Sequence, residues 1–282
     1  MTRLVLNRTN PSRPRAAVPA GRIPRTGGWF SKQPVRAVRR AQILEFFENR
    51  PPGRVLDVPA GSLWLARALA AHRFEVHALD LLDHESSAAA AGIRYVQGNL
   101  DRGLPQFGDR TFDYVVCTEG LEHLEHPALL LREFARVLRP LGTLLVTTPN
   151  VVSLRSRLKF LLFGYFDGFR RRALFRSLGR RPDLETPHIS PIHIQFLYYW
   201  LVGAGFTHLH VYPLPVHRLE RLALLPLAAL VAALGWATAR DPGDHYQAEF
   251  RTLLLSRPLL FSPTVILTAQ RAERADGGAG AE

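Results

Sequence analysis

The sequence predicts an α/β fold built on a doubly wound, mostly parallel sheet. Short apolar runs with strand character alternate with helical patterns from about residue 54 to residue 148. Acidic or amide side chains follow the first three of these runs. The composition, 47% hydrophobic and 21% charged, is that of a globular protein with a sizeable core.

A helix is predicted first, over residues 35–49, because Val38, Ile43, Phe46 and Phe47 have helical spacing and Pro51-Pro52-Gly53 ends the pattern. The alternation that follows predicts strands at 54–58, 75–79, 93–97, 112–117 and 143–148, and helices at 63–71, 86–91 and 128–138. These are βαβ units, which place the carboxyl ends of the strands at one edge.

Beyond Asn150 the pattern predicts a helix at 195–203, a sixth strand at 206–212 and a seventh at 264–271. Between the last two strands we expect a helical hydrophobic insertion, residues 217–255. Its uncharged run of 18 residues, 222–239, is at the lower limit for a membrane span. Since one crossing would separate the last strand from its sheet, we expect an interfacial, re-entrant or dimer helix, kinked at Pro226.

Charge is concentrated in two segments of a chain whose net charge is +12. Residues 1–34 and 272–282 are predicted to be disordered tails, the first of them basic, around a domain spanning 35–271. Residues 151–205 form a basic and aromatic region in which Arg155, Arg157 and Lys159 alternate with Phe and Leu. This pattern fits an anionic membrane surface or a phosphate-bearing substrate; nucleic acid and a solvated charged face are the alternatives.

A cytoplasmic location is expected from the lone Cys117 and from an N-terminal segment without a signal-peptide pattern.

The predicted strand ends carry a candidate nucleotide-binding edge. Asp57 is followed by Pro59-Ala60-Gly61, a turn that lets a ligand approach the backbone at a helix N-terminus. Asp80 comes 23 residues after Asp57 and could accept both ribose hydroxyls, and Asn99-Leu100 could contact a base. Taken singly, each also fits an ordinary cap or turn. With Gly61 alone, the dinucleotide phosphate fingerprint is missing.

Seven segments in order resemble the motif series of class I S-adenosylmethionine-dependent methyltransferases, in the branch of ubiquinone-biosynthesis and cell-surface-glycan enzymes: 55–61, 78–80, 99–100, 112–117, 119–124, 136–142 and 148–150. The resemblance implies a Rossmann-like seven-stranded sheet with an antiparallel last strand. It implies S-adenosylmethionine as the cofactor, bound by Asp57, Pro59, Ala60, Gly61, Asp80, Leu81, Asn99, Leu100 and Thr118.

One departure from the family lies in the first turn. The usual Gly-x-Gly stands here as Pro59-Ala60-Gly61, so one glycine and its conformational freedom are lost. A catalytically silent cofactor-binding protein of the same fold is therefore one alternative.

Methyl transfer from a sulfonium needs in-line positioning and removal of a proton from the acceptor. The candidate bases are His123, His126, His188 and His193. We predict His123, Glu119 and His193 as the catalytic residues: the resemblance places the first two beside the reactive end of the cofactor, and the third lies in a candidate substrate lid.

A metal is not expected, although the ubiquinone-type E-x-x-E-H pattern, which can hold a divalent ion, is matched by Glu119, Glu122 and His123. No Cys and His cluster has the spacing of a zinc site.

The predicted function is O-methylation of a small-molecule or of a lipid- or glycan-linked acceptor near the cytoplasmic membrane face. A nucleic-acid methyltransferase is disfavoured, because Thr118-Glu119-Gly120-Leu121 stands where amino-modifying base methyltransferases have their Asp/Asn-Pro-Pro-Tyr/Phe motif.

Overall fold

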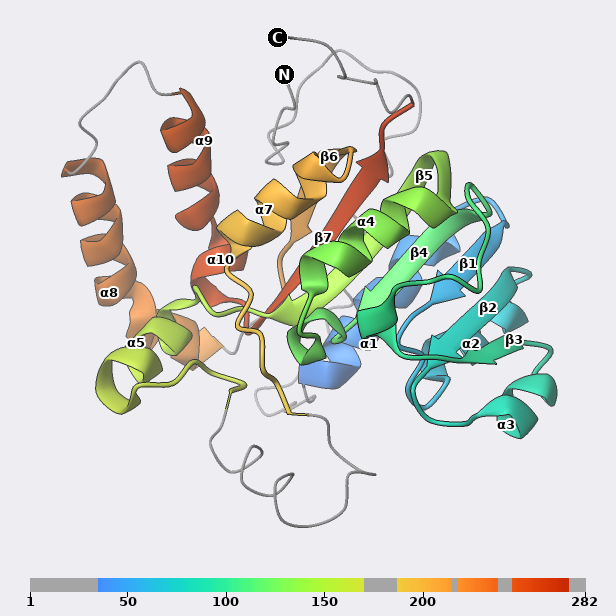
Figure 1. The fold of residues 1–282 in the computed structure, drawn as a ribbon. Coiled ribbons are helices and arrows are strands. Elements are labelled where there is room, and N and C mark those ends of the chain that lie inside the picture. The colour runs from blue at the N-terminus through green and yellow to red at the C-terminus, as the bar shows by residue number, and fades with distance from the viewer. Residues whose placement is uncertain (1–34, 170–186, 215–217, 238–244, 274–282) are drawn as a thin grey trace, which may run out of the picture.

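The structure, a computed structural model, describes residues 35–169, 187–214, 218–237 and 245–273. Its centre is a seven-stranded sheet with the order β3-β2-β1-β4-β5-β7-β6 (Figure 1). The strands are β1 Arg54–Asp57, β2 Glu75–Asp80, β3 Arg94–Gln97, β4 Phe112–Thr118, β5 Leu138–Pro149, β6 Phe206–Tyr212 and β7 Thr264–Arg271. The first five strands pair in parallel, whereas β7 is antiparallel to both β5 and β6. The predicted fold class is confirmed.

Two helical layers cover the sheet because the strands alternate apolar side chains between its faces. Val55 and Val116 pack with the buried side chains of α1 and α2, while Leu56 and Val115 pack with those of α4 and α7. In Figure 1, α4 and α7 lie in front of the sheet. The helices are α1 Val35–Glu48, α2 Trp64–Ala71, α3 Glu85–Ala89, α4 Pro127–Val137, α5 Leu154–Phe163, α7 Ile194–Gly203, α8 Arg218–Ala237, α9 His245–Leu254 and α10 Arg257–Phe261, with 3-10 turns η1 Leu100–Arg102 and η2 Leu121–His123.

The fifth strand is longer than the sequence predicts. It begins at Leu138, immediately after α4, rather than at residue 143. Pairing of Leu138 with Phe112 extends it, and the ladder is irregular between Phe112 and Tyr114. A glycine is needed at position 142, since a Cβ there would lie 2.8 Å from the backbone oxygen of Arg139.

The expected helical insertion lies between β6 and β7, at the left of Figure 1. Helix α8 contains Pro226 and packs on α5 through a small cluster of Leu154, Ala228 and Leu260. None of the helices in the described residues combines the length and apolarity needed to cross a membrane. Residues 1–34 and 274–282, and residues 170–186 of the basic region, lie outside the described part of the chain.

Candidate functional site

The carboxyl edge of the sheet gathers the side chains that the sequence singles out. Because β1 pairs in parallel with both β2 and β4, Asp57, Asp80 and Thr118 end three adjacent strands at this edge. Strand β5 runs parallel to β4, so α5 also begins at this edge. The candidate site residues therefore lie along one rim of the molecule.

Asp80 holds the turn after β1 in place. Its Oδ2 accepts a hydrogen bond from the backbone N–H of Gly61 (2.7 Å), and its Oδ1 accepts one from Leu82 (3.1 Å). Gly61 has a φ of +50°, and no atom lies within 4 Å of the place where a Cβ would stand. The turn thus presents open space beside a carboxylate whose oxygens keep further lone pairs for a ligand's hydroxyls.

Asp57 is buried beneath this turn, with 1% of its surface exposed. Its Oδ2 accepts a hydrogen bond from the backbone N–H of Ala66 (3.2 Å), whereas its Oδ1 has no hydrogen-bond partner in the described residues. Burial raises the pKa of Asp57 well above its usual range, and the neighbouring carboxylate of Asp80 raises it further, against the opposing effect of the Ala66 hydrogen bond.

The Pro59 ring in the turn after β1 fits because residue 120, in the segment after β4, is a glycine. Pro59 follows a cis peptide bond, and Ala60 donates its backbone N–H to Leu79 (3.0 Å). A Cβ at Gly120, in the segment after β4, would lie only 2.3 Å from Cδ of Pro59. Since Gly120 has no Cβ, the Pro59 ring and the segment after β4 lie in direct contact.

The remaining predicted cofactor residues occupy different environments. The side-chain oxygen of Asn99 accepts a hydrogen bond from the backbone of Asp101 (2.9 Å) and so caps η1. Leu100 is buried in the main core, Leu81 is exposed, and Thr118 is half-buried at the end of β4. Their predicted contacts with the cofactor stay predictions.

Glu119, directly after β4, is bound by α1. Its backbone is in the left-handed region (φ +52°), and its N–H donates to the backbone oxygen of Thr147 (2.9 Å). Its carboxylate forms an ion pair with Arg39 (2.8 Å) and accepts a hydrogen bond from the Thr147 hydroxyl (3.2 Å). The sequence did not single out Arg39, because nothing in the pattern of α1 shows which strand end it faces.

Glu122 is fully buried on the next turn. Its Oε2 accepts a hydrogen bond from the Thr148 hydroxyl (3.1 Å), and its backbone oxygen accepts two more, from the N–H groups of Ile189 and Ser190. Burial, followed by the nearby Glu119, raises the pKa of Glu122 to about 8. These contacts attach the segment from residue 187 onward to the end of β4.

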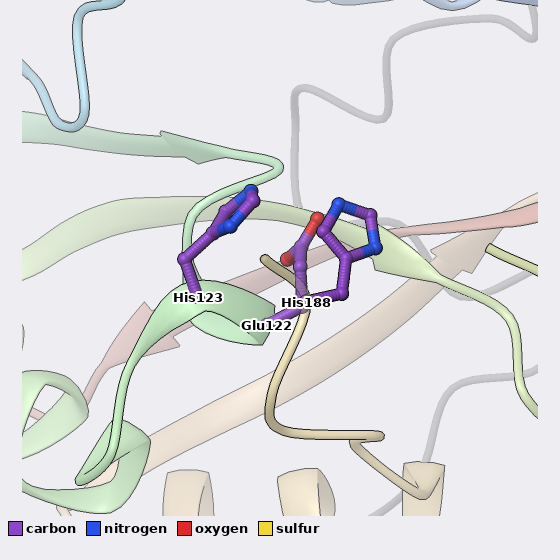
Figure 2. Close-up of side chains that lie close together, drawn as sticks. All are labelled: Glu122, His123 and His188. Atoms are coloured by element: carbon purple, nitrogen blue, oxygen red, sulfur yellow. The ribbon is translucent and has the colours of Figure 1, made fainter. Parts of the chain in front are cut away.

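His123 lies against that segment. The rings of His123 and His188 meet edge to face with centroids 4.6 Å apart, and the Glu122 carboxylate lies between them in the view of Figure 2. Nδ1 of His123 is 3.2 Å from the backbone oxygen of Pro187, so this nitrogen carries the proton and Nε2 is left as an acceptor. Burial lowers the pKa of His188 to about 4, with His123 adding to the effect and the backbone of Gly168 opposing it.

His193 is placed elsewhere. It precedes α7, and its Nδ1 accepts a hydrogen bond from the backbone N–H of Gln195 (3.2 Å), which makes it the N-cap of that helix. Its ring packs near Phe196 and Phe250. In the described residues His188, rather than the predicted His193, joins His123 and Glu122; which of them acts in catalysis stays a prediction.

The edge fits a cationic ligand that donates hydrogen bonds. Asp80 supplies a carboxylate, and Oδ1 of the buried Asp57 carboxyl is unpaired in the described residues. S-adenosylmethionine carries a sulfonium, an ammonium group and two ribose hydroxyls, so its chemistry matches. A pyrophosphate would instead be repelled by the carboxylate of Asp80.

Comparison with known proteins agrees with this geometry. A family model described as a methyltransferase domain matches residues 33–211. The chain is 36% identical over 108 residues to a ubiquinone biosynthesis O-methyltransferase of Xanthomonas campestris (36% of this chain, 44% of the relative). It is 32% identical over 140 residues to that of Xylella fastidiosa (44% of this chain, 56% of the relative). The chain thus spans about half the length of these curated relatives.

A solved SAM-dependent methyltransferase from Archaeoglobus fulgidus has the same fold, with a TM-score of 0.53 and 17% identity over 84% of this chain and 94% of that one. Since the family model covers well over half of the sequence, the chain belongs to the methyltransferase domain family, as a class I member that uses S-adenosylmethionine.

Proposed function

We propose that this protein transfers the methyl group of S-adenosylmethionine to an oxygen of a small-molecule or lipid-linked acceptor. The observation that carries the proposal is the group formed by Glu122, His123 and His188 beside Gly120, which touches the cofactor turn at Pro59. In this arrangement the acid–base side chains lie next to the strand ends where we expect the methyl donor to bind.

The chemistry is a single displacement. The acceptor oxygen forms a bond to the methyl carbon, the carbon–sulfur bond breaks, and its electron pair stays on sulfur as a neutral thioether. The hydroxyl proton of the acceptor must leave, and the group around His123 is the place proposed for its removal. Positioning and proton removal together provide most of the rate enhancement that such a reaction needs.

Oxygen as the acceptor atom is supported by the relatives, which are named ubiquinone biosynthesis O-methyltransferases. Their likeness covers 36% and 44% of this chain, so the acceptor itself has to be inferred from the chain's own elements. We expect it to be recognised by the segments that follow β5, including the loop that contains His188.

An apolar surface next to the site favours a lipid-linked acceptor. Helix α5 exposes Leu161 (80%), Leu162 and Phe163 (64%), and α8, packed against α5, exposes Leu222 and Leu230. Both helices adjoin the edge where the cofactor turn lies. We propose that this surface, called here the α5/α8 surface, inserts into the cytoplasmic face of a membrane and lets an acceptor enter from it.

Two of the basic side chains of α5, Arg155 and Lys159, are paired within the protein. Arg155 pairs with Asp167 (2.9 Å) and Glu220 (3.1 Å), and Lys159 also pairs with Asp167. Membrane binding at the described residues is thus expected to depend more on apolar insertion than on attraction to anionic headgroups, and to weaken without vanishing at high salt.

Two measurements test the proposal. Label from methyl-labelled S-adenosylmethionine should appear in an acceptor carrying a free hydroxyl and not in its methyl ether; no transfer to any hydroxyl acceptor would favour the silent binding protein. Flotation with phosphatidylethanolamine and phosphatidylglycerol vesicles should retain the protein. Leu161→Ser with Phe163→Ser should lower binding by about tenfold or more, because burying one such side chain contributes roughly 1.5–3 kcal/mol.

Leu141→Ser is the matched control, since Leu141 is also exposed (52%) but belongs to the start of β5, away from α5. Equal loss in both variants, or no flotation of the full chain at any ionic strength, would contradict membrane insertion and favour a soluble acceptor. Retention on RNA or DNA at low salt would instead favour the nucleic-acid alternative.

A further inference from the structure

Three side chains beside the cofactor turn have the composition of a metal site. One possible ligand atom from each of Glu122, His123 and His188 lies within 4.8 Å of the others. They come from two segments, η2 and the loop before α7, which are tied together by hydrogen bonds from Ile189 and Ser190 to the backbone oxygen of Glu122. Figure 2 shows the three side chains converging.

Glu122 supplies an independent sign of a missing partner. The residue is fully buried, and while Oε2 accepts a hydrogen bond from Thr148, Oε1 has no hydrogen-bond partner in the described residues. Buried carboxylate oxygens in proteins are nearly always hydrogen-bonded or bound to a cation. The unpaired oxygen therefore indicates a ligand at this place.

Both imidazoles are oriented for ligation. His123 Nδ1 faces the backbone oxygen of Pro187 (3.2 Å), which leaves Nε2 for a ligand. A backbone carbonyl on the far nitrogen is the usual support for a metal-binding histidine, because it fixes both the tautomer and the ring orientation, and His123 has this support. Nδ1 of His188 is buried and has no hydrogen-bond partner in the described residues, so a ligand for this ring is also missing.

Glu119, the first residue of the E-x-x-E-H pattern, does not belong to this group. Its two carboxylate oxygens are engaged by Arg39 and by the hydroxyl of Thr147. Glu119, Glu122 and His123 match the pattern in the sequence, but they are not the set of side chains that comes together in the structure. His188, more than 60 residues further along the chain, takes the third place.

We propose that Glu122, His123 and His188 bind one divalent transition-metal ion, of the zinc or cobalt type. Two imidazole nitrogens and one carboxylate suit such ions, whereas magnesium prefers oxygen ligands. Three protein ligands leave a position open for an oxygen ligand. The use of that position by the acceptor rests on the proposed function, and there the ion would act as a Lewis acid for the acceptor oxygen.

The test measures metal binding without cofactor or acceptor, so that its failure can be told apart from failure of the methyl transfer. Full-length protein is treated with chelator, dialysed, and titrated with Co²⁺ while the visible absorption of the ion is recorded; the stoichiometry is checked by elemental analysis after Zn²⁺ loading. We expect one ion per chain. His188→Gln and His123→Gln should each lower the affinity for Co²⁺ by about a hundredfold or more.

Two matched variants separate this site from the alternatives. His126→Gln removes an exposed histidine of the same segment, and Glu119→Gln removes the carboxylate bound by Arg39; both should retain the affinity for Co²⁺ within about threefold. Loss of binding in Glu119→Gln would overturn the assignment in favour of the E-x-x-E-H set. The proposal is also overturned if wild-type protein binds no Co²⁺ or Zn²⁺, or if both histidine variants remain folded by circular dichroism and bind as wild type.

Discussion

The carboxylate of Asp80 offers the sharpest test of the cofactor edge. It accepts backbone hydrogen bonds from Gly61 and Leu82, so Asp80→Ala removes a ligand contact and also leaves two N–H groups of the binding turn without an acceptor. Losing the contact to the ribose hydroxyls should weaken binding by about 1.5–3 kcal/mol. Loosening of the turn adds to this, so we expect at least a 10- to 100-fold loss.

Calorimetric titration with S-adenosylmethionine and with S-adenosylhomocysteine measures the effect, and both ligands should be weakened equally because both carry the ribose. Asp80→Asn is the control. Its single carbonyl oxygen can serve only one of the two N–H groups, so its affinity should also fall clearly. Wild-type affinity in a folded Asp80→Ala protein would refute the placement of the ribose at Asp80, and a loss confined to thermal stability would assign the residue a purely structural role.

Three further changes test the surroundings of the site. Gly120→Ala puts a Cβ 2.3 Å from Pro59 and should weaken cofactor binding severalfold by displacing that turn, as calorimetry would show. Asp57→Asn should gain stability relative to wild type as the pH rises: burial raises the pKa of the folded carboxyl, so its stabilising effect is complete near pH 4 and below and is lost at up to about 1.4 kcal/mol per pH unit toward the folded pKa. Asn150→Ala should lower the free energy of unfolding by about 2–4 kcal/mol in urea, because the buried amide donates to the carbonyls of Leu259 and Ser262 and accepts from Val152.

Each of these results has a contrary outcome. Unchanged cofactor affinity in Gly120→Ala would show that the turn can shift away from the added methyl group without weakening cofactor binding. A stability difference for Asp57→Asn that stays constant between pH 4 and pH 7 would show that the carboxyl titrates normally. A loss below about 1 kcal/mol for Asn150→Ala would mean that water replaces the amide.

The sequence predicts the sheet well and the group formed by Glu122, His123 and His188 only in part. Strands at 206–212 and 264–271 agree with β6 and β7, because alternating burial leaves a period of two in the sequence. The start of β5 was wrong, since Arg139-Pro140-Leu141-Gly142 has the composition of a turn but pairs as an irregular strand. His123 was found through its neighbours in the motif.

Contacts between distant segments could not be predicted in this way. The choice between His188 and His193 depends on which of them the loop before α7 carries to η2, and no local pattern records it. The same holds for Arg39, whose partner Glu119 lies 80 residues away. Such pairs are decided by the packing of whole elements, which a single sequence does not reveal.

The contact between Pro59 and Gly120 restricts the order in which this chain could have acquired, or could exchange, its residues. A side chain at position 120 is acceptable only after the ring at position 59 has gone, whereas losing the ring first leaves a small gap that the backbone tolerates. The effect of a substitution at position 120 therefore depends on whether Pro59 has already been replaced. Recombination that introduces a side chain at position 120 would therefore succeed only when a turn without the Pro59 ring is inherited with it, whereas exchange of the turn alone is acceptable.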